Sequence, residues 1–114
     1  MRIEEKEGIY VFYLEDRYLQ DTEPPNLISY LKDHLKQGHK KFIFNFASVH
    51  HLITQVMGLL VVCGRRCDDA GAILKLSNLN EFIMKTLETT HLSDQFEIYE
   101  SVDEALESFR DQQY

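Results

Sequence analysis

The sequence predicts an α/β fold, in which a mixed sheet of four to five strands packs against four helices. Two observations lead to this class. Short apolar runs such as Lys41–Phe46 have the length and residue types of buried strands, and runs that are apolar throughout are typical of parallel strands. The longer segments between these runs carry apolar residues at helical spacing. Helices that separate successive strands imply right-handed parallel crossovers, with the helices covering the sheet.

The N-terminal part is predicted to form two strands and one helix. Met1–Glu5 is predicted to be a short edge strand. Ile9–Leu14 is apolar on both faces, so this strand is predicted to be central. The polar segment 15–25 is predicted to be a loop that leads into a helix, because it ends in a proline pair and proline is tolerated in a first helical turn. Gly38 is predicted to end that helix.

The same alternation continues to the C-terminus. Gly71 is predicted to end a long second helix, and Asn80 to cap a short third one. Ser101 and Glu104 have the spacing of a capping box. The remaining predicted elements are a helix at Thr54–Ala70, a strand at Ala72–Leu76, a short helix with Phe82, Ile83 and Leu87, a strand at Phe96–Tyr99 and a terminal helix after Ser101.

The net charge of −7 narrows the classes of partner. An acidic protein repels nucleic acid and anionic membrane surfaces, and no basic stripe in the sequence opposes that repulsion. We therefore expect no nucleic-acid binding, whereas the charge suits a basic patch on a protein partner. The sequence has no signal-peptide pattern and no apolar run long enough to cross a bilayer. We expect no membrane insertion and a cytoplasmic location.

No catalytic pattern is recognisable, so we do not expect an enzyme. The sequence contains no glycine-rich phosphate loop after a strand, no nucleophile elbow and no acid pair at a defensible spacing. The adjacent His50 and His51 suggest a metal, but no Cys or further His stands at ligand spacing. We interpret them as one half-buried and one solvated junction residue, and we expect neither a metal nor a cofactor.

Cys63 and Cys67 are four residues apart, which places them on one face of the predicted second helix. They are either a redox pair or two small core residues. Cysteine is among the most often buried residue types, and adjacent helical turns aim two Cβ atoms side by side, which suits a disulfide poorly. We therefore favour the core interpretation.

Four segments together resemble the STAS domain, the family of bacterial anti-sigma factor antagonists and of the cytoplasmic tails of sulfate transporters. In order they are GHKKFIFNFASV, LITQVMGLLV, AGAILKLSNLNEFIMKTLETTHLSDQFEIY and SVDEALESF. They resemble the family's central strand, the turn and helix after it, the following strand with its downstream segment, and the terminal helix. The resemblance covers nearly the whole chain and implies a single STAS-like domain over residues 1–114.

In antagonists of this family, a serine at the start of the second helix is phosphorylated by a partner kinase that is also the anti-sigma factor. The resemblance places this acceptor at Thr54 and puts Ile53 where the family has an aspartate. It implies an anti-sigma factor antagonist in a phosphorylation-controlled partner switch, with Thr54 as candidate phosphoacceptor. Asp16 and Asp21 lie in a loop that approaches this site in the family. The implied partner-binding residues are Gln55, Val56, Met57, Gly58, Leu60 and Asp21.

Several alternatives remain open from the residues themselves. The hydroxyl of Thr54 is also placed to cap the helix N-terminus. The apolar start of this helix is either additional core or homodimer contact, or an exposed docking patch. Ile53 favours a different function, that of a non-phosphorylated STAS scaffold or transporter-associated subunit. Binding of a nucleotide or another small ligand is a third hypothesis.

Overall fold

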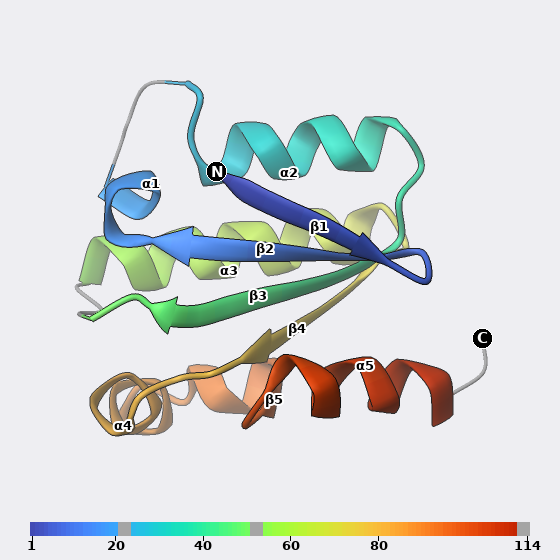
Figure 1. The fold of residues 1–114 in the computed structure, drawn as a ribbon. Helices are drawn as coiled ribbons and strands as arrows, with labels where there is room; N and C mark the ends of the chain where they lie inside the picture. The colour runs from blue at the N-terminus through green and yellow to red at the C-terminus, as the bar shows by residue number, and fades with distance from the viewer. Residues whose placement is uncertain (21–23, 51–53, 112–114) are drawn as a thin grey trace.

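The computed structural model describes residues 1–20, 24–50 and 54–111 (Figure 1). The strands are β1 (Arg2–Lys6), β2 (Ile9–Glu15), β3 (Lys41–Ser48), β4 (Ile73–Ser77) and β5 (Glu97–Tyr99). The helices are α1 (Asp16–Gln20), α2 (Leu27–Lys36), α3 (Thr54–Asp69), α4 (Glu81–Thr89) and α5 (Val102–Asp111), with a 3-10 helix, η1, at Leu92–Gln95. No helix within these ranges has the length and apolar character needed to cross a bilayer.

The five strands form one sheet in the order β1-β2-β3-β4-β5. β1 and β2 make an antiparallel hairpin, and both turn residues, Glu7 and Gly8, have the positive φ that a two-residue type I′ turn requires. Strands β2 to β5 are parallel, which confirms the predicted mixed sheet. Because parallel strands share a direction, β2, β3 and β4 all end on the same side of the sheet (Figure 1).

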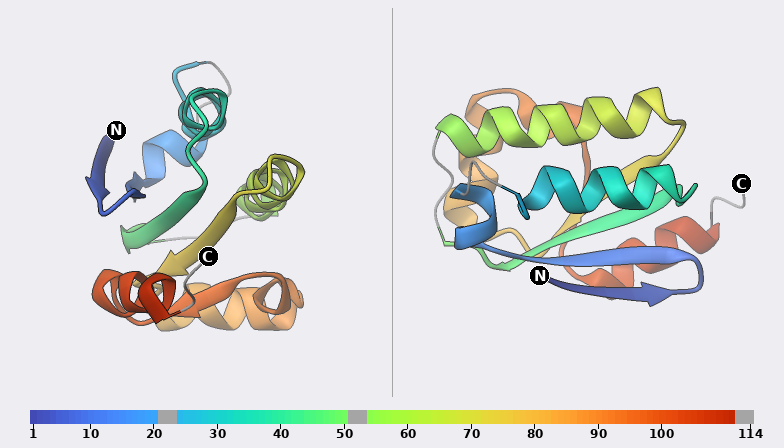
Figure 2. Two further views of the ribbon diagram at one scale, coloured as in Figure 1. Left: turned by 90° about the vertical axis from the view of Figure 1, so that its right-hand side faces the viewer. Right: turned by 90° about the horizontal axis from the view of Figure 1, so that it is seen from above.

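Helices cover both faces of the sheet. On one face, α2, α3 and α4 bury apolar side chains in a large core around Phe12 and Phe44. On the other face, α5 covers a smaller core that contains Val11, Ile43 and Phe109. Figure 2 shows the sheet between α2 and α3 on one side and α5 on the other. This arrangement leaves the ends of the parallel strands available for a site.

Most of the predicted elements lie within two residues of their predicted bounds. The strand at Ile9–Glu15 pairs on both sides and is therefore central, as predicted. Gly38 and Gly71 have φ values of +87° and +71° after α2 and α3, the left-handed conformation expected of residues that end helices. The side chain of Asn80 accepts a hydrogen bond from the N–H of Ile83 at 2.7 Å, which confirms the predicted cap.

The predicted loop at 15–25 is wrong, because it contains helix α1. This raises the number of α-helices in the described residues from the predicted four to five. A helix this short shows little periodicity in the sequence, and Leu19 holds it in place by packing into the core. The proline pair precedes α2, whose N-cap is Asn26; its side chain accepts from the N–H of Ser29 at 3.0 Å.

The capping box before α5 forms only in part. The Ser101 hydroxyl accepts the N–H of Glu104 at 3.1 Å, as predicted. The Glu104 carboxylate accepts from the N–H of Glu100 at 3.1 Å, one residue earlier than the pattern predicts.

Candidate functional site

Three segments that are far apart in the sequence meet where the parallel strands end. Asp16 begins α1 directly after β2, His50 follows β3, and Asn80 precedes α4. The backbone N–H of His50 donates to Asp16 Oδ1 at 3.3 Å, and His50 Nδ1 lies 3.2 Å from Asp16 Oδ2. The side-chain amide of Asn80 donates to the carbonyl of His50 at 3.5 Å. These contacts connect the segment before α3 to both of its neighbours.

The strand β3 and the residues after it position this junction. Val49 is 1% exposed and packs in the larger core, and its N–H donates to the carbonyl of Phe46 at 3.0 Å. His50, next in the chain, has 70% of its side chain exposed. The chain therefore turns from buried to exposed within one residue, just before the site.

Helix α3 begins at Thr54, so the candidate phosphoacceptor stands at the helix N-terminus. The N–H groups of a first helical turn have no partner within the helix, and together with the helix dipole they favour an anion. The first turn of α3 carries no acidic residue that would repel one. Because the side chain of Thr54 lies outside the described part of the structure, its role as a cap of this turn stays a prediction.

Several predicted positions are outside the described part of the chain. These are Asp21, His51 and Ile53, together with the side chains of Thr54 and Gln55. The predictions that involve them stay predictions.

The structure divides the apolar start of α3 between core and surface. Val56 and Leu60 are 2% and 0% exposed and pack in the larger core, which corrects the prediction that their side chains contact a partner. They share the inward side of the helix because they are four residues apart. Met57 is half-buried and Gly58 is exposed. Val62, one turn after Gly58, is 39% exposed and continues the outward side.

The two cysteines confirm the core interpretation. Cys63 and Cys67 are free thiols that lie in the larger core, at 0% and 1% exposure. Burial raises the pKa of each thiol to about 12, so both stay protonated at neutral pH. Because the thiolate is the reactive form, neither side chain is suited to redox or nucleophilic chemistry.

His50 is not part of a metal-binding cluster in the described residues. His50 is solvated, as one of the pair was predicted to be, and its ring contacts Asp16. Within residues 1–20, 24–50 and 54–111, no three His, Cys, Asp or Glu side chains are placed to hold a metal ion.

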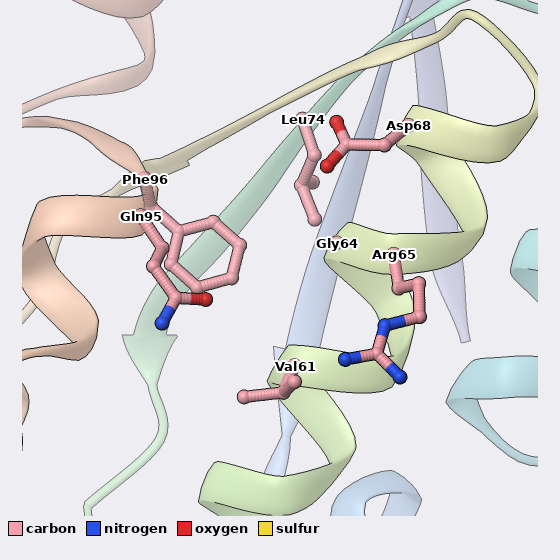
Figure 3. Close-up of a pocket in the computed structure, with 7 residues that line it drawn as sticks. All are labelled: Val61, Gly64, Arg65, Asp68, Leu74, Gln95 and Phe96. Atoms are coloured by element: carbon pink, nitrogen blue, oxygen red, sulfur yellow. The ribbon is translucent and has the colours of Figure 1, made fainter.

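A hollow of about 420 Å³ lies beside the middle of α3, away from its N-terminus (Figure 3). Arg65 and Asp68 of α3 stand on one side of it, and Gln95 and Phe96 stand on the other. Gly64 allows this close approach, because a Cβ at that position would lie 3.1 Å from the Phe96 ring. The sequence gives no sign of this hollow, because its walls meet only through tertiary packing.

Sequence reasoning also missed that Asp16, His50 and Asn80 meet. A signal was present, because each residue follows one of three predicted strands and the carboxyl ends of parallel strands lie side by side. This signal predicts a contact only when the order of the strands in the sheet is known, and the sequence alone does not determine that order.

Comparison with known proteins places this geometry in a family. The family model of the STAS domain matches residues 1–105. A search of curated protein sequences found no significant match. Among solved structures, RsbS of Moorella thermoacetica, in a variant with a serine-to-glutamate substitution, has a TM-score of 0.80 and 13% identity, with 100% of both chains covered.

Two further structures share the fold. An anti-sigma-factor antagonist (STAS) domain protein from Planctomyces limnophilus has a TM-score of 0.72 and 14% identity, covering 96% of this chain and 97% of its own. A sulfate transporter family protein from Wolinella succinogenes has a TM-score of 0.68 and 17% identity, covering 92% of this chain and 87% of its own. At these identities the likeness concerns the fold alone. The family model covers most of the sequence, and the chain belongs to the STAS domain family.

Proposed function

We propose that this chain is an anti-sigma factor antagonist, and that it binds an anti-sigma factor with serine kinase activity in a phosphorylation-controlled partner switch. Residues 1–114 would act as one regulatory, non-catalytic domain in the bacterial cytoplasm and take part in transcription regulation. The similarity to the Planctomyces limnophilus antagonist supports the class of function.

The position of Thr54 as the first residue of α3 is the observation that carries this proposal. A phosphate on Thr54 would meet the free N–H groups and the positive end of the helix dipole, an interaction that contributes up to about 2 kcal/mol. The first turn has no carboxylate to oppose it. The phosphorylated form is therefore compatible with the folded helix, as a reversible switch requires.

The docking surface of this proposal is the outward side of the first α3 turns. Met57 and Gly58 belong to it, whereas Val56 and Leu60 support it from the core. Gln55, whose side chain lies outside the described part of the structure, stays a predicted contact. Phosphorylation adds a charge of roughly −1.5 to −2 next to these apolar groups. A partner that buries Met57 against its own apolar surface would have to desolvate that charge, so phosphorylation would release it.

The test is intact-mass measurement after incubation with ATP and the antagonist-system serine kinase encoded in the same genome. We expect the wild-type chain to gain the mass of one phosphate and Thr54→Ala to gain none. Thr89→Ala is the matched control, because this exposed hydroxyl only donates to the carbonyl of Lys85 within α4, and it should gain phosphate as the wild type does. An unmodified wild type that nevertheless binds the kinase would contradict the switch.

A second candidate function is a non-phosphorylated STAS scaffold or transporter-associated subunit. Ile53 favours it, because the family's antagonists carry an acidic residue at this position. The similarity to the Wolinella succinogenes sulfate transporter family protein is compatible with it. Affinity purification followed by mass spectrometry separates the two: a kinase partner and a Thr54 phosphate support the first candidate, and a membrane transporter or a larger STAS assembly without phosphate supports the second.

A further inference from the structure

The net charge of this chain lies on one side of the molecule. Residues 1–80 contain ten acidic and ten basic side chains, so they carry no net charge. Residues 81–111 contain nine acidic side chains against Lys85 and Arg110, so they carry the whole net charge of −7. This acidic segment forms α4, β5 and α5, which lie on the side of the molecule away from α2 (Figures 1 and 2).

The outward side of α4 combines charged and apolar side chains, and we call it the α4 ridge. It consists of Glu81, Met84, Lys85 and Glu88, which share one side of the helix because they are three or four residues apart. The three charged side chains are exposed, and Met84 is half-buried. Within residues 1–20, 24–50 and 54–111, neither glutamate forms an ion pair. Both carboxylates are therefore available to a partner.

A groove of about 350 Å³ lies between α2 and α3, and we call it the α2–α3 groove. Its lining consists of Lys32, Leu35 and Lys36 from α2 and of Arg66, Asp69 and Ala70 from α3. The three cations are exposed and outnumber the one carboxylate. In the part of the chain that the structure describes, none of these cations forms an ion pair. The groove is therefore a positively charged surface with apolar contact area.

The α4 ridge and the α2–α3 groove are complementary in charge and in pattern. On each surface, two like charges stand on either side of one apolar residue along a helix: glutamates around Met84, and lysines around Leu35. The minority charges match as well, because Lys85 is the one cation of the ridge and Asp69 is the one carboxylate of the groove. Helices pack on their neighbours by placing ridges of side chains into grooves. The two surfaces thus have the composition of two sides of one contact.

We propose that the α4 ridge of one copy of this chain binds in the α2–α3 groove of a second copy. Helices α2 and α4 lie on opposite sides of the molecule, so one chain cannot bring its own two surfaces together (Figures 1 and 2). After two copies bind, one ridge and one groove are left over for further copies. Such a head-to-tail contact continues into a ring or an open row of copies instead of closing at a dimer.

The distribution of charge selects this orientation of the second copy. The net charge of −7 opposes association in general, and two copies that met through their acidic sides would repel each other. A head-to-tail contact keeps the acidic sides apart, because the groove belongs to residues 1–80, which carry no net charge. At physiological salt the Debye length is about 8 Å, so long-range repulsion is screened more than the charge pairs within the contact.

The proposed contact is separate from the site at Thr54. Arg66 lies twelve residues after Thr54 in α3, which is about 18 Å along the helix. No residue of the α4 ridge belongs to the proposed kinase-docking surface. The inference therefore stands whether or not Thr54 is phosphorylated.

Sedimentation velocity between about 10 µM and 1 mM chain, in about 150 mM salt, tests the proposal. We expect the average mass of the wild type to rise with concentration from 13.4 kDa and to pass the mass of two copies. The ridge variant, Glu81→Gln and Glu88→Gln, should associate at least tenfold more weakly. The groove variant, with Lys32→Gln, Lys36→Gln and Arg66→Gln, should show the same loss.

An equimolar mixture of the two variants makes the test specific. Each variant lacks one surface and keeps the other, so the mixture should form a heterodimer through one intact contact and should grow no further. This heterodimer also shows that both variants are folded. The matched control is Glu107→Gln with Asp111→Asn, which removes two exposed carboxylates from α5 and changes the net charge as the ridge variant does. The control should associate within threefold of the wild type.

Four results would overturn the proposal. The first is a wild type that stays at 13.4 kDa up to about 1 mM. The second is a wild type that stops at a dimer, because a head-to-tail contact between opposite sides does not close with two copies. Equal weakening by the ridge variant and its control would reduce the effect to general charge attraction. Failure of the mixed variants to form a heterodimer would show that ridge and groove do not bind each other.

Discussion

The ammonium group of Lys75 donates a hydrogen bond to the hydroxyl of Ser108 at 2.7 Å, and so joins β4 to α5 inside an otherwise apolar layer. The Lys75 side chain is 0% exposed. Its Nζ also lies 3.7 Å from Glu97 Oε2 and 4.1 Å from the centre of the Phe109 ring. Burial lowers the pKa of Lys75, and the charge of Glu97 offsets part of this shift. The charged form of Lys75 is therefore less favourable in the folded protein than in water.

The first prediction is that Lys75→Met leaves the free energy of unfolding unchanged or raises it by about 1 kcal/mol. Replacing a buried charge by an apolar side chain of similar volume is often neutral or stabilising. Neither Ser108 nor Glu97 is stranded by the change, because the Ser108 hydroxyl still donates to the Ala105 carbonyl at 2.7 Å and Glu97 is half exposed. Urea denaturation measures the difference.

Lys32→Met is the control for this change, because Lys32 is exposed on α2 and should alter stability by less than about 0.5 kcal/mol. Lys75→Ala should destabilise the chain, since it leaves a cavity beneath α5. A loss of more than about 2 kcal/mol in Lys75→Met would mean that the charge itself holds α5 on the sheet.

A second prediction concerns pH and rests on the pair His34 and His39. Their Nδ1 atoms are 2.8 Å apart, and the hydroxyl of Tyr10 lies 3.1 Å from the other ring nitrogen of His39. Burial, followed by the nearby charge of His39, lowers the pKa of His34 below its ordinary value of 6.5. Between the folded and the unfolded pKa, the unfolded chain therefore binds more protons than the folded chain.

Stability should consequently fall as the pH drops through about 6.5 and level off below the folded pKa of His34. Urea denaturation at pH 7.5 and pH 5.0 measures this loss. His34→Gln, which cannot be protonated, should lose less stability over the same interval. If the wild type and His34→Gln lost the same free energy of unfolding between pH 7.5 and pH 5.0, His34 would not be the source of the pH dependence.

The pattern of apolar residues was sufficient to predict most strands and helices. Runs such as Phe42–Phe46 have few alternatives to a buried strand, and glycines at positive φ mark the ends of α2 and α3. The position of Thr54 at a helix start was predictable for the same reason. Because local pattern determines these features, they did not require knowledge of the tertiary structure.

Features that depend on the packing of distant segments were not predictable. Helix α1 is held by Leu19 in the core, and Asp16 meets His50 only because β2 and β3 are neighbours. An apolar helix start likewise does not reveal which side faces the sheet, so Val56 and Leu60 were placed on a docking surface although both are buried.

The third prediction separates those two sides of α3. Leu60→Ala should destabilise the chain by about 2–5 kcal/mol, because it opens a cavity in the larger core. Val62→Ala, at a position with 39% exposure, should change stability by less than about 0.5 kcal/mol. Thermal and urea unfolding of both variants checks this, and similar losses in the two would contradict the observed orientation of the helix.

The last prediction concerns Asn80, which caps α4 through one side-chain atom and contacts the site through another. Its Oδ1 accepts the N–H of Ile83 at 2.7 Å, and its Nδ2 donates to the His50 carbonyl at 3.5 Å. Asn80→Ala should cost about 1 kcal/mol, because it removes the cap. Asn80→Asp keeps the cap but turns the donor to His50 into a carboxylate oxygen that faces the His50 carbonyl, so it should lose stability by less than Asn80→Ala does. Urea denaturation of the three proteins compares them, and an equal loss in both variants would place the stabilising role of Asn80 in its contact with His50 instead of in the cap.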